Sequence, residues 1–213
     1  MGNKYLEDLD VQLMLRVRNG DDEAFATIVE KHASMLVNFM YRYVGCRVTG
    51  EDLAQDVFMR VFRAAPNYEP KARFKTWLLT IATNICLNQK RWEKHRNHLS
   101  LSRDDQDDGP RGSVELDSGA ESPDDSMEKE ELRERVRDAI AGLPEKQRAA
   151  LLLRRYEQLS YAEIATSLGL SLMAVKSLLN RAKEGLKERL GRDLEDWYPA
   201  SSTALGDSEK GLG

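Results

Sequence analysis

The chain has 213 residues, of which 41% are hydrophobic and 32% charged, which suits one domain or two small ones with an unusually charged surface. No stretch approaches the roughly 18 uninterrupted apolar residues of a membrane span, and the acidic N-terminus lacks the apolar run of a signal peptide. We therefore expect no membrane insertion and a cytoplasmic location. The net charge of −4 is at first sight unfavourable for binding nucleic acid.

The net charge is unevenly distributed along the chain. Residues 1–102 carry 15 basic and 12 acidic side chains, and residues 132–192 carry 13 and 7. Residues 103–131 carry 3 basic and 12 acidic side chains, and residues 193–213 carry 1 and 5. Because binding to DNA responds to the local field, two basic segments separated by acid are compatible with a nucleic-acid-binding protein.

Composition divides the chain into two folded parts. The segment around 103–127 is rich in Asp, Ser, Gly and Pro, has no aromatic residue and cannot bury enough apolar area to offset its ordering entropy. No alternating run rich in Val, Ile and Thr occurs, so both flanking parts are predicted to be helical. We expect an all-α protein with helical domains at 10–97 and 128–192, a flexible acidic linker at 98–127 and a disordered tail at 193–213.

The N-terminal part shows several helical signals in order. Apolar periodicity predicts helices over 10–17 and from residue 21 to about 40. Thr49 and Asp52 fit a capping box that would open a helix with one continuous apolar stripe ending at Phe62. Pro66 and Pro70 enclose a loop, and a last helix is predicted from about 74 to 96.

The C-terminal part contains the pattern of a helix-turn-helix. Ser160 and Glu163 form a second capping box, Gly169 ends that short helix, and Ser171 can cap the next. The second helix would expose a set of side chains that suits the DNA major groove, because Lys and Arg contact guanine or phosphate and Asn reads adenine: Lys176, Ser177, Asn180, Arg181 and Lys183. The alternative is an amphipathic helical hairpin whose basic residues only keep it soluble.

Two further surfaces are predicted in the first part. Residues 71–96 hold seven basic residues and one acidic residue together with aromatic and Asn side chains, a mixture that suits single-stranded DNA. The alternative is that Phe74 and Trp77 belong to the core and the basic face is only solvated, and for Trp77 the core is the favoured interpretation. The helix over 51–63 exposes a mixed set that suits protein docking rather than DNA: Asp52, Gln55, Asp56, Met59, Arg60 and Arg63.

The chain resembles extracytoplasmic-function (ECF) sigma factors of bacterial RNA polymerase across nearly its whole length. The segments that carry the resemblance are GDDEAFATIVEKH, EDLAQDVFMRVFRA, FKTWLLTIATNICLNQKR, LPEKQRAALLLRRYEQLSYAEIA and VKSLLNRAK. It implies that the 51–63 helix docks on the clamp of the polymerase β′ subunit. It also implies that the loop after that helix, with the next helix, melts the promoter −10 element and captures a flipped base.

The resemblance also implies residue roles. The single-stranded −10 element would be contacted by Tyr68, Lys75, Ile81, Asn84, Asn88 and Arg91. Arg154 and Tyr161 would join the helix-turn-helix set that reads the −35 duplex. Family members often have Arg where this chain has Leu178, so no particular −35 sequence is carried over.

The resemblance implies core RNA polymerase (β′ clamp and β flap), promoter DNA and an anti-sigma protein as partners. It also implies initiation of transcription of a specific, stress-response gene set. No catalytic residue, metal site or cofactor is expected. The rival interpretation is an autonomous helix-turn-helix regulator, which would bind duplex DNA without polymerase. A nucleic-acid enzyme is disfavoured because the acidic residues of the folded parts lie mostly where they cap helices.

Overall fold

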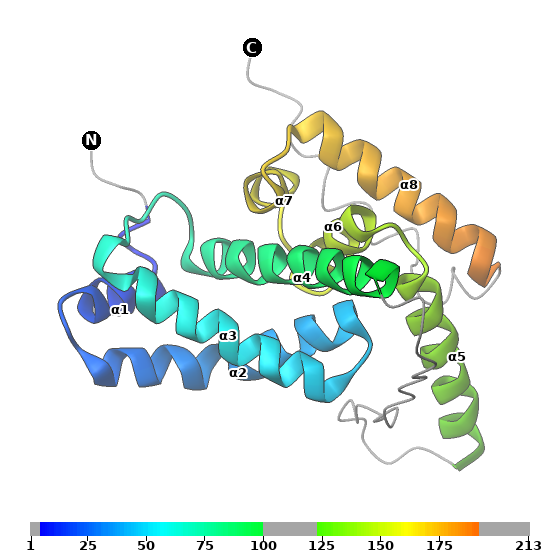
Figure 1. Ribbon diagram of the computed structural model, residues 1–213, viewed down its shortest axis with the longest axis horizontal. Helices are drawn as coiled ribbons and strands as arrows, with labels where there is room; N and C mark the ends of the chain where they lie inside the picture. Colours follow the sequence, from blue (N-terminus) through cyan, green and yellow to red (C-terminus); the bar gives the residue numbers. More distant parts are fainter. Residues whose placement is uncertain (1–4, 100–122, 192–213) are drawn as a thin grey trace.

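The computed structural model describes the backbone of residues 5–99 and 123–191, and the side chains of residues 5–89 and 130–191. The described residues form helices and no strand (Figure 1), which confirms the all-α prediction. The predicted tail and residues 100–122 of the predicted linker lie outside the described residues. The elements are α1 (Leu9–Arg18), α2 (Asp22–Val44), α3 (Arg47–Ala64), the 3-10 helix η1 (Ala65–Asn67), α4 (Phe74–Leu99), α5 (Pro123–Ala141), α6 (Glu145–Arg155), α7 (Tyr161–Leu168) and α8 (Leu172–Leu190).

The first two helices begin at acidic caps. The Asp8 side chain accepts a hydrogen bond from the backbone of Asp10, and Asp21 accepts one from Ala24. These bonds satisfy amide groups that have no partner within a helix. Helix α2 ends at Gly45 with φ +84°, a left-handed conformation that glycine adopts without a side-chain clash.

The capping box predicted at Thr49 was wrong. Helix α3 begins two residues earlier, at Arg47, and its N-cap residue Cys46 makes no side-chain capping bond. Packing explains the earlier start, because a Cβ atom at Gly50 would lie 2.9 Å from the backbone nitrogen of Tyr41 in α2. The close approach of α2 and α3 therefore fixes this segment as helix, overriding the local capping signal.

The N-terminal helices enclose one apolar core. Helices α2 and α3 form a hairpin, and α1 and α4 pack against it (Figure 1). Phe62, predicted to continue the buried stripe of α3, is instead 49% exposed, with its ring 5.0 Å from that of Phe25. The largest fully buried side chains of this part are Met14, Ile28, Leu36, Phe39, Met40, Tyr43, Phe74, Leu78 and Leu79.

Helices extend into both ends of the segment predicted to be a disordered linker. Helix α4 continues to Leu99, and α5 begins at Pro123. The sequence at the start of α5 explains its early beginning. Proline is tolerated in the first turn of a helix, because the amide hydrogen it lacks would have no partner there.

The C-terminal part forms the predicted helix-turn-helix. The capping box is present: Ser160 Oγ accepts a hydrogen bond from the Glu163 backbone, and the Glu163 carboxylate accepts one from the Ser160 backbone. Gly169 ends α7 with φ +61°, and the Ser171 side chain caps α8 through the Ala174 amide. These local signals confirm the predicted start and end of α7 and the start of α8.

The two parts are packed against each other rather than held only by the linker. Helix α4 lies between the α2–α3 hairpin and the C-terminal helices, and α7 packs across it (Figure 1). Lys75 Nζ is 3.0 Å from Glu157 Oε2, and Thr76 Oγ1 donates to Glu163 Oε1 at 3.2 Å. Sequence analysis gave no sign of this contact.

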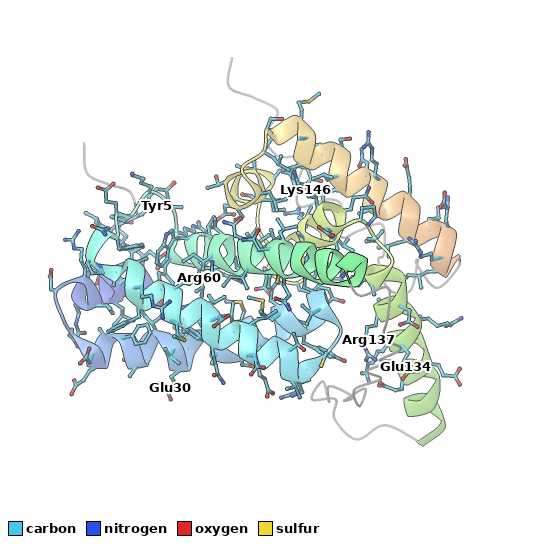
Figure 2. The ribbon with its side chains drawn as sticks, viewed as in Figure 1. Tyr5, Glu30, Arg60, Glu134, Arg137 and Lys146 are labelled. Atoms are coloured by element: carbon cyan, nitrogen blue, oxygen red, sulfur yellow. The ribbon has the colours of Figure 1, made fainter. Side chains whose placement is uncertain are left out.

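Arginine side chains also join the two parts near the C-terminal end of α2. Arg148 of α6 is buried and donates to the backbone oxygen of Tyr43 at 2.8 Å. The guanidinium carbon of Arg42 lies 4.2 Å from the ring centroid of Tyr156. The guanidinium carbon of Arg137 in α5, labelled in Figure 2, lies 5.8 Å from the ring centroid of Tyr41. Hydrogen bonds and cation–π contacts therefore add to the apolar packing of the interface, because the buried apolar residues of both parts form one contiguous cluster.

No single helix within the described ranges is long and apolar enough to cross a membrane. Helices α7 and α8 reach that length and composition only as a pair, across a bend of 100°.

Candidate nucleic-acid interface

Helix α8 presents the predicted duplex-reading side chains on its surface. Val175, Ala182 and Leu186 are buried and hold the helix on α6 and α7. All five residues predicted on the exposed side of this helix are exposed: Lys176, Ser177, Asn180, Arg181 and Lys183. The helix therefore offers cationic and amide donors to a groove.

Arg154 and Tyr161, expected beside this set, pair with each other. The Arg154 guanidinium carbon is 5.2 Å from the Tyr161 ring centroid, and Arg154 Nη1 donates to the Leu159 backbone oxygen at 2.9 Å. Arg154 therefore stabilises the turn before α7, and both side chains are only half-buried. Leu178, which stands where relatives often have Arg, is half-buried and packs against the core.

Tyr68, expected in a base pocket, is 3% exposed. Its ring meets that of Trp77 edge-on at a centroid distance of 4.8 Å. Its hydroxyl has no hydrogen-bond partner among the described residues. Burial, followed by the charges of Asp8 and Asp10, raises the pKa of Tyr68 to about 12. The phenol is neutral at physiological pH and contributes one wall of a cavity.

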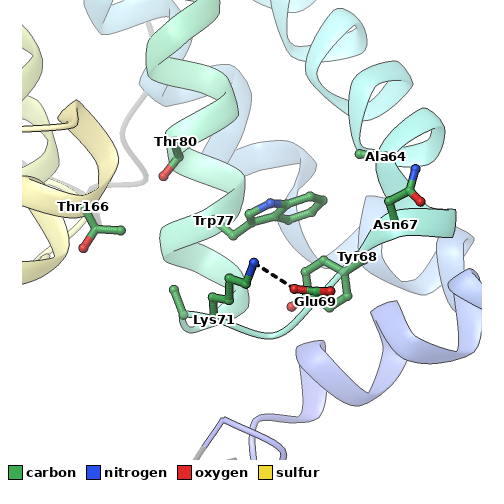
Figure 3. Close-up of a pocket in the computed structure, with 9 residues that line it drawn as sticks. Ala64, Asn67, Tyr68, Glu69, Lys71, Trp77, Thr80 and Thr166 are labelled. Atoms are coloured by element: carbon green, nitrogen blue, oxygen red, sulfur yellow. Dashed lines mark ion pairs between the residues drawn. The ribbon is translucent and has the colours of Figure 1, made fainter.

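That cavity lies between the loop after η1 and the start of α4, and has a volume of about 440 Å³. We call it the L3 hollow, because this is the third loop between consecutive α-helices. Trp77 and Tyr68 stand at its centre, and Lys71 reaches across to Glu69 at 2.8 Å (Figure 3). The hydrogen bond and charge of Lys71 hold the pKa of Glu69 below its ordinary value. The residues that line the L3 hollow are Ala64, Asn67, Tyr68, Glu69, Lys71, Ala72, Trp77, Thr80 and Thr166.

The other predicted −10 residues lie outside the L3 hollow. Asn84 and Asn88 are exposed one turn apart on α4, and Ile81 beside them is half-buried. Lys75 points to the C-terminal part and pairs with Glu157. The Arg91 side chain lies outside the described residues. The predicted −10 residues thus fall into separate places: Tyr68 in the cavity wall, Asn84 and Asn88 exposed on α4, and Lys75 in the contact with the C-terminal part.

The docking face predicted on α3 is exposed at every position. Asp52, Gln55, Asp56, Met59, Arg60 and Arg63 all reach the surface. Two apolar residues of this helix, Val48 and Phe62, are also exposed, and the sequence did not predict their exposure. Val48, Gln55, Met59 and Phe62 recur at steps of seven, four and three, the spacing of a seam that contacts another helix.

Four polar residues that line the L3 hollow were not predicted from the sequence: Asn67, Glu69, Thr80 and Thr166. Asn67 ends η1 and Glu69 lies on the loop after it, where apolar periodicity carries no information, and Lys71 was predicted only as part of the basic stretch 71–96. Trp77 packs against the core, as favoured for it from the sequence, and its half-buried ring also lines the cavity. The available signal was Asn67 and Glu69 between two prolines, with Lys71 directly after the second, since such loops often carry binding residues.

Comparison with known proteins identifies both halves. The chain matches the family Sigma-70 region 2 over residues 28–96 and Sigma-70, region 4 over residues 133–186. It is 32% identical to RNA polymerase sigma-H factor of Pseudomonas aeruginosa, over 86% of this chain and 95% of that protein. It is 30% identical to ECF RNA polymerase sigma factor SigW of Bacillus subtilis, over 84% of this chain and 95% of that protein.

Solved structures agree on the fold. CnrH, solved in complex with the cytosolic domain of CnrY, superposes with a TM-score of 0.63 at 22% identity, covering 87% of this chain and 99% of that chain. RpoE of Bartonella quintana, solved with the anti-sigma factor NepR, gives 0.58 at 23% identity, with 78% and 96% covered. The chain belongs to the sigma-70 family and, within it, to the extracytoplasmic-function sigma factors.

Proposed function

We propose that this protein directs core RNA polymerase to promoters through three surfaces: α3 binds the polymerase, α8 reads the −35 duplex, and the L3 hollow with α4 engages the melted −10 strand. The observation that carries the proposal is the pairing, in one chain, of an exposed basic helix-turn-helix face with an aromatic cavity flanked by cations. The protein would act by binding alone, in keeping with a family of initiation factors.

Reading the −35 element requires donors that fit the major groove. The exposed face of α8 supplies Lys176, Asn180 and Arg181, and such side chains discriminate between bases when they reach the base edges. The second helix of a helix-turn-helix enters the groove with its N-terminal residues foremost. Val175 and Leu186 are buried where α8 packs against α6 and α7, and this packing keeps the orientation of the exposed face of α8 fixed.

Melting the −10 element requires a site that prefers an unpaired base. Trp77 and Tyr68 give the L3 hollow aromatic walls, and an extruded base gains stacking there that a paired base does not. Asn84 and Asn88 on α4 can form hydrogen bonds with neighbouring bases, and Lys71 can approach a phosphate. This differential binding would offset the unstacking of the duplex.

Docking on the polymerase is assigned to the α3 face. Exposed apolar residues at helical seam spacing, Val48, Met59 and Phe62, favour a helical partner surface. The charged residues between them, such as Asp56 and Arg60, would set its orientation. We also expect an anti-sigma protein that competes for this face. CnrH and the Bartonella RpoE, which share the fold, were each solved with a bound partner.

Promoter binding would require the two parts to separate. Elements named −10 and −35 lie about 25 base pairs apart, or roughly 85 Å of helix axis at 3.4 Å per pair. In the structure α7 lies directly against α4, and Thr166 of α7 forms part of the wall of the L3 hollow. The arrangement described here would therefore be a closed state that opens when polymerase and DNA are bound.

The test is run-off transcription with purified core polymerase on a library of genomic fragments, with and without this protein. Discrete transcripts that depend on the protein, with a shared upstream sequence, would support the proposal. If folded protein yields no such transcripts but binds a duplex site without polymerase, the autonomous regulator replaces the proposed function.

A further inference from the structure

The start of α8 exposes apolar side chains that the proposed function does not use. Met173 is 78% exposed and Leu172 is 42% exposed, and both lie in the first turn of the helix. That turn contains no acidic residue. Single exposed apolar residues are common and need no explanation, so the position of Met173 relative to its neighbours decides whether it has a role.

Helical geometry places Met173 among the predicted reading residues. Residues three, four and seven positions apart share one helix face, so Met173 lies in line with Lys176, Ser177 and Asn180. All four are exposed. The buried stripe of the same helix begins at Val175, on the other side. Met173 is therefore the leading residue of the surface assigned to the groove.

The closed arrangement of the domains leaves this residue uncovered. The contact between the two parts is made by α5, α6, α7 and the turn before α7, and among the described residues the main element pairs that form it do not include α8. Met173 lies beyond the turn at Gly169, at the start of the next helix. A core role is excluded by its exposure, and a role in domain closure is excluded by the residues that make the contact.

We infer that Met173 reads sequence by packing on the C5-methyl group of a thymine in the −35 duplex; the inference rests on the proposed role of α8. The thymine methyl is the apolar feature that distinguishes a T·A pair in the major groove. In a helix-turn-helix the N-terminal residues of the second helix meet the base edges. Methionine is unbranched and polarizable, so it adapts its shape to a methyl group.

The inference gives this sigma factor a specificity element distinct from its hydrogen-bonding residues. Lys176 and Asn180 would read donors and acceptors, whereas Met173 would read the presence of one methyl group. A −35 element for this protein should therefore contain at least one thymine at the position that faces the start of α8. Cytosine or uracil at that position would lack the methyl contact.

The experiment uses full-length protein bound to core polymerase and a promoter found by run-off transcription. Each thymine of the −35 element is replaced in turn by deoxyuridine, which removes only the methyl group. We expect one position at which the wild-type holoenzyme loses about fourfold in affinity, the effect of one buried methyl-sized group. The Met173→Ala variant should bind thymine and deoxyuridine promoters equally, and Met173→Leu should restore most of the discrimination.

Controls separate this inference from the proposed function. Leu9→Ala removes another exposed apolar side chain, 68% exposed on α1, and should leave the thymine preference unchanged. If Met173→Ala discriminates thymine from deoxyuridine as the wild type does, or if no thymine of the −35 element responds, the inference is overturned. If mutating the whole −35 element has no effect on the wild type, the proposed function of α8 fails instead.

Discussion

Replacing Glu157 by Gln should shift the protein from the closed toward an open arrangement. Glu157 lies in the turn between α6 and α7, and its side chain is 4% exposed. Its carboxylate pairs with Lys75 of α4 at 3.0 Å, and its backbone oxygen accepts a second bond from the same ammonium group at 3.1 Å. Glutamine preserves the shape and the backbone bond and removes only the charge.

The size of the effect follows from the exposure of the pair. Hydrogen bonds to charged groups contribute about 1.5–3 kcal/mol and neutral ones about 0.5–1.5 kcal/mol. Because the Lys75 side chain is 40% exposed, solvent screening keeps the free-energy difference between the charged and the neutral bond small, at about 1 kcal/mol. Since 1.4 kcal/mol is a tenfold change, the closed-to-open ratio should fall roughly fivefold.

Förster transfer between dyes at positions 59 on α3 and 187 on α8 would measure this ratio. Raising the salt concentration should open the wild type, because salt screens the ion pair, and should affect Glu157→Gln less. The control is Arg47→Gln, which breaks the exposed Arg47–Glu51 pair within α3 and should not change the transfer. A Glu157→Gln protein with the wild-type closed fraction and salt response would refute the argument.

Four further outcomes are expected. Arg181→Ala should weaken −35-dependent transcription about 10- to 100-fold, the loss of one base or phosphate contact, with unchanged polymerase affinity by fluorescence titration. Asp56→Arg should do the reverse, weakening polymerase binding by reversing a charge on α3. Asn84→Ala should slow promoter opening, measured by permanganate reactivity, and a pre-melted −10 bubble should restore part of the rate. Glu163→Gln should be less stable than the wild type at about pH 5, and the difference between the two in thermal melts should shrink as the pH falls to about 3.5.

The sign of the pH effect follows from the contacts of Glu163. Burial alone would raise the pKa of this carboxyl, but hydrogen bonds from Ser160 and Thr76 outweigh it, and the pKa lies below the ordinary 4.5. The unfolded chain therefore binds the proton more readily than the folded one. The stability that Glu163 contributes is complete above about pH 4.5 and is lost as pH falls through the lower, folded-state pKa.

Sequence patterns predicted those features that depend on neighbouring residues. Ser160 and Glu163 close a capping box within four residues, and Gly169 ends a helix by its own backbone freedom, so both were found. The same rule failed at Thr49, because the start of α3 is set by its crossing with α2 at Gly50. Tertiary packing overrides a local signal that contributes only about 1 kcal/mol.

The contact between domains could not be predicted because its residues look like solvated surface. Thr76, Thr80 and Ser167 are small polar residues with no apolar pattern, and they meet only when α7 packs against α4. The burial of Tyr68 was missed for a related reason, since a tyrosine on a proline-flanked loop gives no indication of which side faces the core. Both outcomes depend on residues far apart in the sequence.

The hydroxyl contacts between α4 and α7 favour reversible closure. Thr80 Oγ1 meets Ser167 Oγ at 3.3 Å, and Thr76 meets the carboxylate of Glu163. On separation these groups exchange protein partners for water, a change of only about 0.5–1.5 kcal/mol each. An apolar interface would instead lose about 25 cal/mol for each Å² exposed. If the two DNA-binding parts separate on a promoter as we propose, the hydroxyl contacts between α4 and α7 add little to the cost of opening, and most of that cost comes from the apolar packing that the two parts share.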